Sequence, residues 1–315
     1  LVSREAGILL NNVLLVVSAA TVLLGTLYPL VIDALGMGKI SVGPPYFNAV
    51  FIPLTAPLAI LVGVGSLLRW KKDRLTRLIR PLGPAFALAV GLGLLWPIFF
   101  DSYHIGAVFG GVLGLWTIFA ALSGLWQRTR TGGRLQSLSR TPRSVLGMTL
   151  AHIGLGVFVI GVTLTSTYSV EKDLRMAPGD TYEIDGYTFR FDGISQQRGP
   201  NYLSDTGSIT VLRGTRQHAI LNPEKRIYLV QQMPMTEASI DAGLRRDLYV
   251  ALGEALDDQG SWAVRLYVKP YIRWIWLGAL IMVFGGLLST TDKRYRRLSR
   301  ATATSPPIGS SHAVS

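Results

Sequence analysis

His152 is the residue of this sequence whose type and surroundings point most directly to chemistry. It lies in the apolar run from Val145 to Leu164, which is long enough to cross a bilayer and has no other ionisable residue. A neutral imidazole in hydrocarbon is costly unless both ring nitrogens have partners. His152 is therefore either hydrogen-bonded to a neighbouring helix or serves as a ligand or proton relay.

The helix predicted around His152 has two different faces. At about 100° per residue, a stripe of small side chains falls on one side, and it consists of Gly147, Ala151, Gly154 and Gly161. Such a stripe allows another helix to approach closely. His152 points away from it, toward Met148, Gly156 and Val159. We expect Gly156 to leave space one turn beyond the imidazole.

Haem iron is the natural metal for such a histidine. Neutral histidine is a common axial ligand, and an apolar macrocycle suits a slot in the membrane. Zinc or copper would need further histidines, cysteines or carboxylates nearby, none of which is visible, and the chain has 0 cysteines. If His152 is a ligand, we expect it to bind the iron of a haem. A second axial ligand would be Met148, Met282 or a residue of another chain.

The other three histidines fit solvated or interfacial positions better. His104 lies between two apolar runs, at the outer boundary of a hydrocarbon core roughly 30 Å thick, whereas His152 lies only ~12 Å from the inner end of its helix. The two are too far apart in depth to share one iron. His218 falls on a predicted strand and His312 in the C-terminal tail.

Composition predicts a polytopic membrane protein, because 49% of the 315 residues are hydrophobic and only 16% are charged. The net charge of +12 is gathered in clusters at the ends of apolar runs, which argues for membrane topology and against nucleic-acid binding. The chain enters an apolar segment soon after Leu1, so we expect a piece of a longer protein. The predicted spans are about 8–32, 49–68, 81–100, 106–126, 145–165 and 272–289.

Basic residues predict how these spans are oriented. Lys and Arg number six in 69–80, five in 127–143 and five in 291–300, against one in 33–48 and none in 101–105. If the six spans cross the membrane in turn, the three links rich in Lys and Arg all lie on the same side of it. That side is therefore cytoplasmic. In a bacterial inner membrane, residues 166–271 would then be periplasmic. Residues 290–315 would be a basic cytoplasmic segment and a disordered tail.

Residues 166–271 read as an all-β domain. Asp185-Gly186 between two alternating segments is a strong hairpin signal, and turn signals recur near every ten residues. We expect five to seven short strands in an antiparallel barrel or sandwich. The fold class is thus a membrane protein of six transmembrane helices with one extracytoplasmic all-β domain.

Several motifs together resemble the C-terminal half of the CcmF family of cytochrome c-type biogenesis proteins. The resemblance covers nearly all of residues 1–290 in order, and it rests on Ser3-Arg-Glu, Leu10-Asn-Asn12, Lys39-Ile-Ser-Val-Gly-Pro-Pro-Tyr-Phe-Asn48, Met148-Thr-Leu-Ala-His-Ile-Gly154, Tyr168-Ser-Val-Glu-Lys-Asp173 and Arg246-Asp-Leu-Tyr-Val250.

The resemblance implies a subunit of a haem lyase. Such a subunit receives haem from a CcmE-like chaperone and directs its covalent attachment to apocytochrome c. A membrane haem b held between transmembrane histidines would act as electron donor, and CcmH-like or CcmI-like subunits would present the apocytochrome. His152 matches the second of those histidines. This fragment alone is not expected to suffice for catalysis.

The sequence also departs from the family pattern. It has no tryptophan-rich WWD segment, no outer histidine pair for the delivered haem and no first transmembrane histidine, all of which belong to the family's N-terminal half. That half is expected as a partner. The alternative hypotheses are a haem exporter or other transporter, for which no internal repeat is visible, and a non-catalytic anchor for assembly partners.

Overall fold

The computed structural model describes residues 3–65, 67–71, 73–129, 140–230 and 232–292. Six of the described helices are long and apolar enough to cross a membrane. They are α1 (Arg4–Ala34), α2 (Pro44–Gly65), α3 (Leu75–Leu95, continued by the 3₁₀ helix η1, Trp96–Phe99), α4 (Ile105–Thr129), α6 (Arg143–Tyr168) and α7 (Ile272–Thr290). The predicted fold class is confirmed in its six helices.

α1, α2 and α3 begin earlier than the predicted spans, which start at 8, 49 and 81. Pro44 opens α2, where its missing N–H costs nothing. Pro53 and Pro57 fall inside α2. α3 begins at Leu75, within the basic link, and takes Pro81 and Pro84 into its interior.

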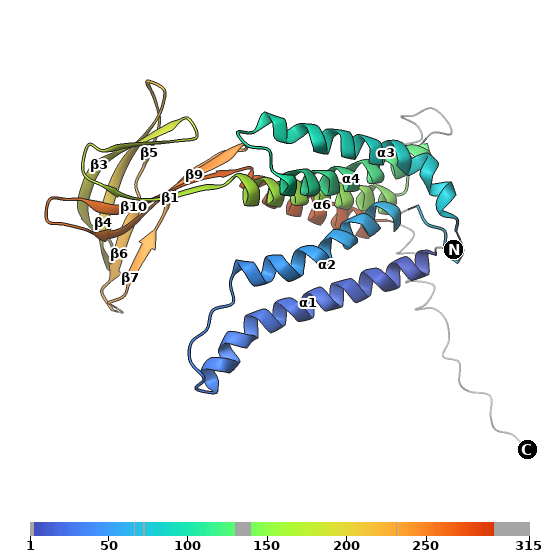
Figure 1. Cartoon of the computed structure of the whole chain (residues 1–315), viewed down its shortest axis with the longest axis horizontal. Coiled ribbons are helices and arrows are strands. Elements are labelled where there is room, and N and C mark those ends of the chain that lie inside the picture. Colours follow the sequence, from blue (N-terminus) through green and yellow to red (C-terminus); the bar gives the residue numbers. More distant parts are fainter. Residues whose placement is uncertain (1–2, 66, 72, 130–139, 231, 293–315) are drawn as a thin grey trace, which may run out of the picture. The chain divides into compact units, whose positions relative to one another are not determined.

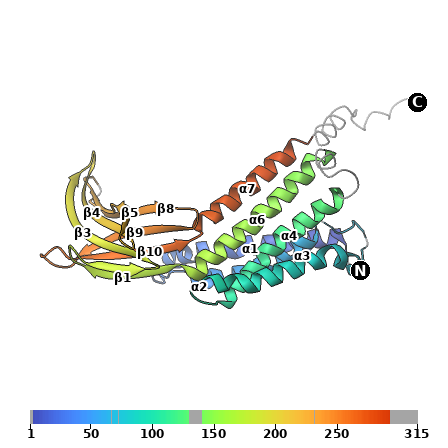
Figure 2. The ribbon, with the colours of Figure 1, turned by 90° about the horizontal axis from the view of Figure 1, so that it is seen from above.

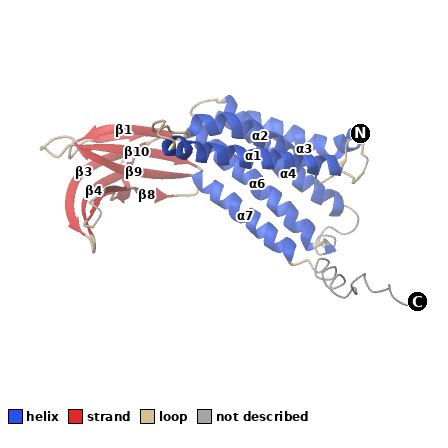
Figure 3. Cartoon of the chain, turned by 90° about the horizontal axis from the view of Figure 1, so that it is seen from below, coloured by secondary structure: helices blue, strands red, loops and turns tan. Residues whose placement is uncertain are grey.

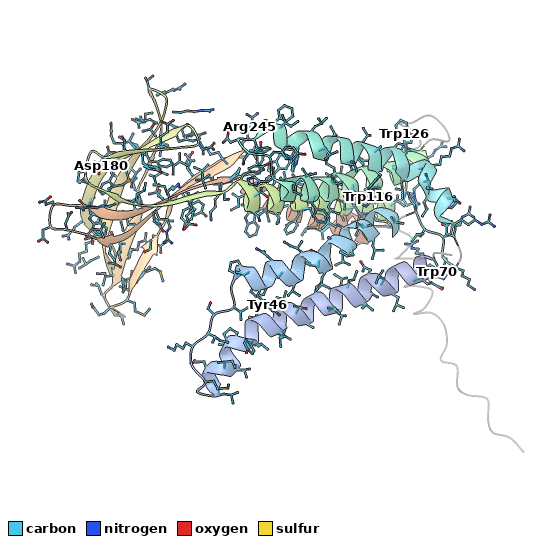
Figure 4. The ribbon with its side chains drawn as sticks, in the orientation of Figure 1. Tyr46, Trp70, Trp116, Trp126, Asp180 and Arg245 are labelled. Carbon is cyan, nitrogen blue, oxygen red and sulfur yellow. The ribbon has the colours of Figure 1, made fainter. Side chains whose placement is uncertain are left out.

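α1 and α2 form an antiparallel pair that lies side by side along its length (Figure 1). Tyr46 of α2 packs where Gly25 of α1 leaves no side chain, and its hydroxyl donates to the Thr21 carbonyl at 3.1 Å (Figure 4). Farther along α2, the indole N–H of Trp116 on α4 donates to the Ile60 carbonyl at 3.3 Å. A side chain at Gly63 would collide with that indole. These contacts tie the pair to α4.

The region between α6 and α7 folds as two antiparallel sheets (Figure 3). One sheet has the order β1-β10-β9-β8, and the other β2-β3-β4-β6-β7 with β5 also on β4. The strands are β1 (Val170–Met176), β2 (Thr181–Ile184), β3 (Tyr187–Arg198), β4 (Tyr202–Arg213), β5 (Arg216–Leu221), β6 (Glu224–Tyr228), β7 (Pro234–Glu237), β8 (Ser239–Ala242), β9 (Arg246–Ala255) and β10 (Trp262–Pro270).

Alternating side chains of both sheets meet in one core. Phe189, Phe191 and Ile209 come from one sheet and Leu248, Val250 and Leu266 from the other, and each is fully buried. The hairpin at Asp185-Gly186 forms as predicted, with both residues at positive φ. The described residues form ten strands, more than the five to seven expected.

Candidate functional site around His152

α6 and α7 lie side by side through the predicted glycine stripe (Figure 2). A methyl group added to Gly154 would lie 2.7 Å from the Gly278 carbonyl oxygen, and one added to Gly161 would lie 2.7 Å from the Ile275 nitrogen. The start of α6 is anchored by the Ser144 N–H, which donates to Asp292 Oδ2 at 2.9 Å. The packing face is therefore confirmed, and it fixes the rotation of α6.

The space expected beside Gly156 is filled. A methyl group there would lie 2.6 Å from both the Gly114 carbonyl oxygen and the Thr117 hydroxyl oxygen, so α4 packs directly against this glycine. The prediction was wrong because Gly156 serves a second helix contact. α6 is thus held by α7 on one side and by α4 on another.

His152 itself is half-buried and, among the residues that the structure describes, makes no hydrogen bond or ion pair. It lines two cavities. The smaller, of about 10 Å³, has room for about one water and is shared with Ala121, Gly124 and Arg128 of α4. The larger, of about 200 Å³, opens on the other side toward α1 and α2. The imidazole therefore borders open space and not a hydrogen-bonding helix.

The larger cavity has three walls. α6 contributes His152 and, one turn earlier, Met148. The other walls are apolar apart from two side chains. They consist of Arg4, Gly7, Ile8 and Asn11 of α1, of Leu61, Val62 and Gly65 at the end of α2, and of Leu68 in the link that follows α2. A side chain at Gly65 would meet no atom within 4 Å. The cavity combines one metal-ligating group with apolar walls and a polar margin.

Backbone contacts hold the α1 wall in register with α2. Ser3 caps α1 by accepting from the Ala6 N–H at 3.1 Å, and the Arg4 N–H donates to the Arg69 carbonyl at 2.9 Å. Arg69 in turn donates its own N–H to Asp73 Oδ2 at 3.0 Å. Arg77 lowers the pKa of Asp73 well below its usual range, against the opposing effect of burial. Asp73 thus stays charged and holds the Arg69 backbone that contacts the start of α1.

The structure separates the other candidate ligands from His152. Met282 packs against Gly154 on the α7 face, away from the cavity. Met148 does share the cavity, but residues four apart lie on the same side of a helix and cannot bind opposite faces of one macrocycle. The ring of His104 packs on Tyr168 at 5.6 Å, and Tyr168 is about 24 Å along α6 from His152.

The remaining histidines are not brought to this site. His218 Nε2 lies 3.1 Å from Asp241 Oδ2, which accepts a hydrogen bond, in a surface cluster of the β domain with Tyr187 and Arg246. His312 lies outside the described residues. No group of three or more His, Cys, Asp or Glu that could hold a metal ion occurs in the described part of the chain.

The residues around His152 suit haem. They offer one neutral nitrogen ligand, apolar walls and a cationic margin, which match the iron, ring and carboxylates of that group. The cavity of about 200 Å³ is smaller than the ~300 Å³ at which ligand pockets usually begin, so it accounts for one side of a slot. The sequence prediction missed Arg4 and Asn11, although their seven-residue spacing and polar character in an apolar run were visible.

Six membrane-spanning helices with a β-sandwich inserted before the last define a multi-pass membrane protein with an all-β domain. The family described as "CcmF C-terminal beta-sandwich" matches residues 167–270. A cytochrome c-type biogenesis protein CcmF of Pseudomonas fluorescens is 48% identical over 294 residues, covering 93% of this chain and 44% of the relative. The chain belongs to the CcmF family and corresponds to its C-terminal half.

Further relatives agree with this assignment. CcmF of Escherichia coli K12 is 43% identical over 305 residues, which are 96% of this chain and 46% of that protein. A solved structure titled "Cytochrome c Heme Lyase CcmF" has the same fold, with a TM-score of 0.73 at 23% identity over 91% of this chain and 46% of that one. The chain spans less than half the length of these relatives. Helices and relatives together indicate a multi-pass protein of the bacterial inner membrane.

Proposed function

We propose that this chain is the C-terminal portion of a haem lyase subunit of cytochrome c biogenesis, and that His152 is an axial ligand of a haem b within it. The observation that carries the proposal is the half-buried imidazole of His152. It has no hydrogen-bond partner among the described residues and borders a cavity of about 200 Å³. A membrane histidine left in this way favours a ligand over a structural hydrogen bond.

The chain's own residues would hold and shield the group. His152 would present a neutral ring nitrogen to the iron, because hydrocarbon disfavours the imidazolium. The rigid contacts of α6 with α4 and α7 would fix the direction of that nitrogen. Ile8, Leu61 and Val62 would exclude water from the ring face. When bound, the haem would supply one-electron transfer, with the second axial ligand coming from the family's N-terminal half.

The membrane orientation belongs to the same proposal. The excess of Lys and Arg in the basic links supports a cytoplasmic position for the starts of α1 and α6 and for the C-terminus. The β-sandwich would then lie in the periplasm, where an apocytochrome c, a CcmE-like haem chaperone and CcmH-like or CcmI-like subunits would meet it. His152 would lie in the inner half of the bilayer, about 13 Å from the start of α6.

The proposal is tested by visible absorption. The chain would be expressed with the N-terminal half that its relatives carry, purified in detergent, and its spectrum recorded before and after reduction. We expect a b-type spectrum in the wild type and its loss or weakening in His152→Ala. Met282→Leu, a change of similar volume on the α7 face, is the matched control and should keep the spectrum. A wild type without haem would favour the non-catalytic anchor.

A further inference from the structure

α1 places two polar side chains on the wall of the His152 cavity. Arg4 and Asn11 lie seven residues apart, with Gly7 and Ile8 between them on the same face, and all four line the cavity. At 1.5 Å per residue, Asn11 lies about 10 Å deeper than Arg4. This depth is close to that of His152, about 13 Å along α6. The cavity therefore has a polar edge that runs inward from its mouth.

Neither side chain is used within the described part of the chain. The Arg4 guanidinium forms no ion pair there, and the Asn11 amide forms no hydrogen bond. Asn11 is half-buried within the apolar part of α1, where a polar side chain without a partner is costly, whereas Arg4 is exposed at the start of the helix. Arg4 contributes to the fold through its backbone N–H, which leaves the guanidinium available.

The charge of the cavity favours an anion. Arg4 is charged, and none of the residues that line the cavity is Asp or Glu. Planar guanidinium groups bind carboxylates with two parallel hydrogen bonds. Gly65 keeps the α2 side of the cavity open, since a side chain there would meet no atom within 4 Å, whereas Gly7 of α1 lies against the Leu68 side chain.

We infer that Arg4 and Asn11 are positioning residues that bind the carboxylate edge of the haem whose iron His152 ligates. This inference rests on the proposed function. Arg4 pairs with a propionate at the mouth of the cavity, and the Asn11 amide N–H donates to the same edge farther in. Arg4 and Asn11 thereby set the orientation of the haem in the cavity. The opposite orientation would place an apolar edge of the haem beside Arg4 and leave the guanidinium without a partner.

The test compares haem b with its dimethyl ester, in which both carboxylates are neutral. Protein expressed with its N-terminal half would be stripped of haem and titrated with each ligand, following absorption. We expect the wild type to bind haem about tenfold or more tightly than the ester. In Arg4→Gln this preference should fall close to one, and Arg4→Lys should keep part of it. Arg80→Gln, an arginine at the inner end of α3 that lines a different groove, should behave as wild type.

Asn11→Ala should lose a smaller part of the preference, with its neighbour Asn12→Ala as control, because Asn12 does not line the cavity. The b-type bands of haem-loaded Arg4→Gln should persist, since His152 is intact. Equal binding of haem and ester by the wild type, or an unchanged preference in Arg4→Gln, would overturn the inference while leaving the His152 assignment standing. A spectrum insensitive to His152→Ala would instead overturn the proposed function.

Discussion

Gly154 of α6 lies so close to Gly278 of α7 that a methyl group at position 154 would be 2.7 Å from the Gly278 carbonyl oxygen. This contact turns the small-residue face of α6 toward α7. His152, two residues earlier, is thereby directed elsewhere, to the side where the larger cavity opens toward α1 and α2. The position of the candidate ligand is thus a consequence of glycine packing.

Replacing Gly154 should loosen this pair of helices. Gly154→Ala would force the two backbones apart, and overpacking of this kind costs about 1–3 kcal/mol. Gly286→Ala on α7 is the matched control, because a side chain there would meet no atom within 4 Å. Thermal unfolding in detergent should show a lower Tm for Gly154→Ala and an unchanged or slightly higher Tm for Gly286→Ala. Equal Tm values would contradict the close packing.

Arg246 should stabilise the β domain through three contacts with two neighbours, Tyr187 and Asp241. Its Nε donates to the Tyr187 hydroxyl at 2.9 Å, its Nη1 donates to Asp241 Oδ2 at 2.6 Å, and its guanidinium lies 4.6 Å from the centre of the Tyr187 ring. Arg246→Met should cost about 1–3 kcal/mol of unfolding free energy. Arg213→Met, which has only the more distant ring contact of 5.6 Å, should change stability by less than about 0.5 kcal/mol.

Arg246→Met should also change the pKa of Asp241. Burial raises the pKa of Asp241, but hydrogen bonds and charge from Arg246, together with His218, hold it below the usual value. Removing Arg246 should therefore raise the pKa of Asp241, which carboxylate NMR of selectively labelled protein can follow. An unchanged pKa would show that the ion pair does not form in solution.

The carboxylate of Asp257 should make the stability of the β9–β10 turn depend on pH. Its carboxylate accepts from the Ser261 N–H at 2.9 Å, the Gln259 N–H at 3.0 Å and Arg175 at 2.6 Å, and Ser261 above all lowers its pKa to about 2. A depressed folded-state pKa gives stability that is full above the unfolded-state value near 4 and is lost as pH falls through 2. Hydrogen exchange of residues 255–262 should quicken over that window. Asp257→Asn should abolish the pH dependence.

Much of this architecture could be predicted because strong patterns specify it. Six long apolar runs indicated the helices, and the seven-residue glycine spacing identified the face of α6 that packs on α7. The helix starts at Pro44 and Leu75 were missed because proline is tolerated both before and within a helix, so its position alone does not fix a boundary. The number of strands was underestimated because short strands such as β7 and β8, of four residues each, are too short to give a distinct pattern in the sequence.

The site could be predicted only in part. His152 stood out because an ionisable group in an apolar run is rare. The cavity beside it could not be predicted, since it depends on how α1 and α2 approach α6 from more than eighty residues away in sequence. The role of Gly156 could not be predicted either. A glycine at this position could equally leave space for a ligand or allow α4 to pack closely, and the sequence does not distinguish the two.

The most direct measurement of the central claim is ligand rescue at His152. His152→Gly, expressed with the N-terminal half, would be purified and its visible spectrum recorded without and with added imidazole. If the ring nitrogen of His152 is the axial ligand, the b-type spectrum should be lost or altered in the variant and restored by imidazole. His104→Gly should show neither effect. A spectrum of His152→Gly that equals that of the wild type before imidazole is added would contradict the assignment.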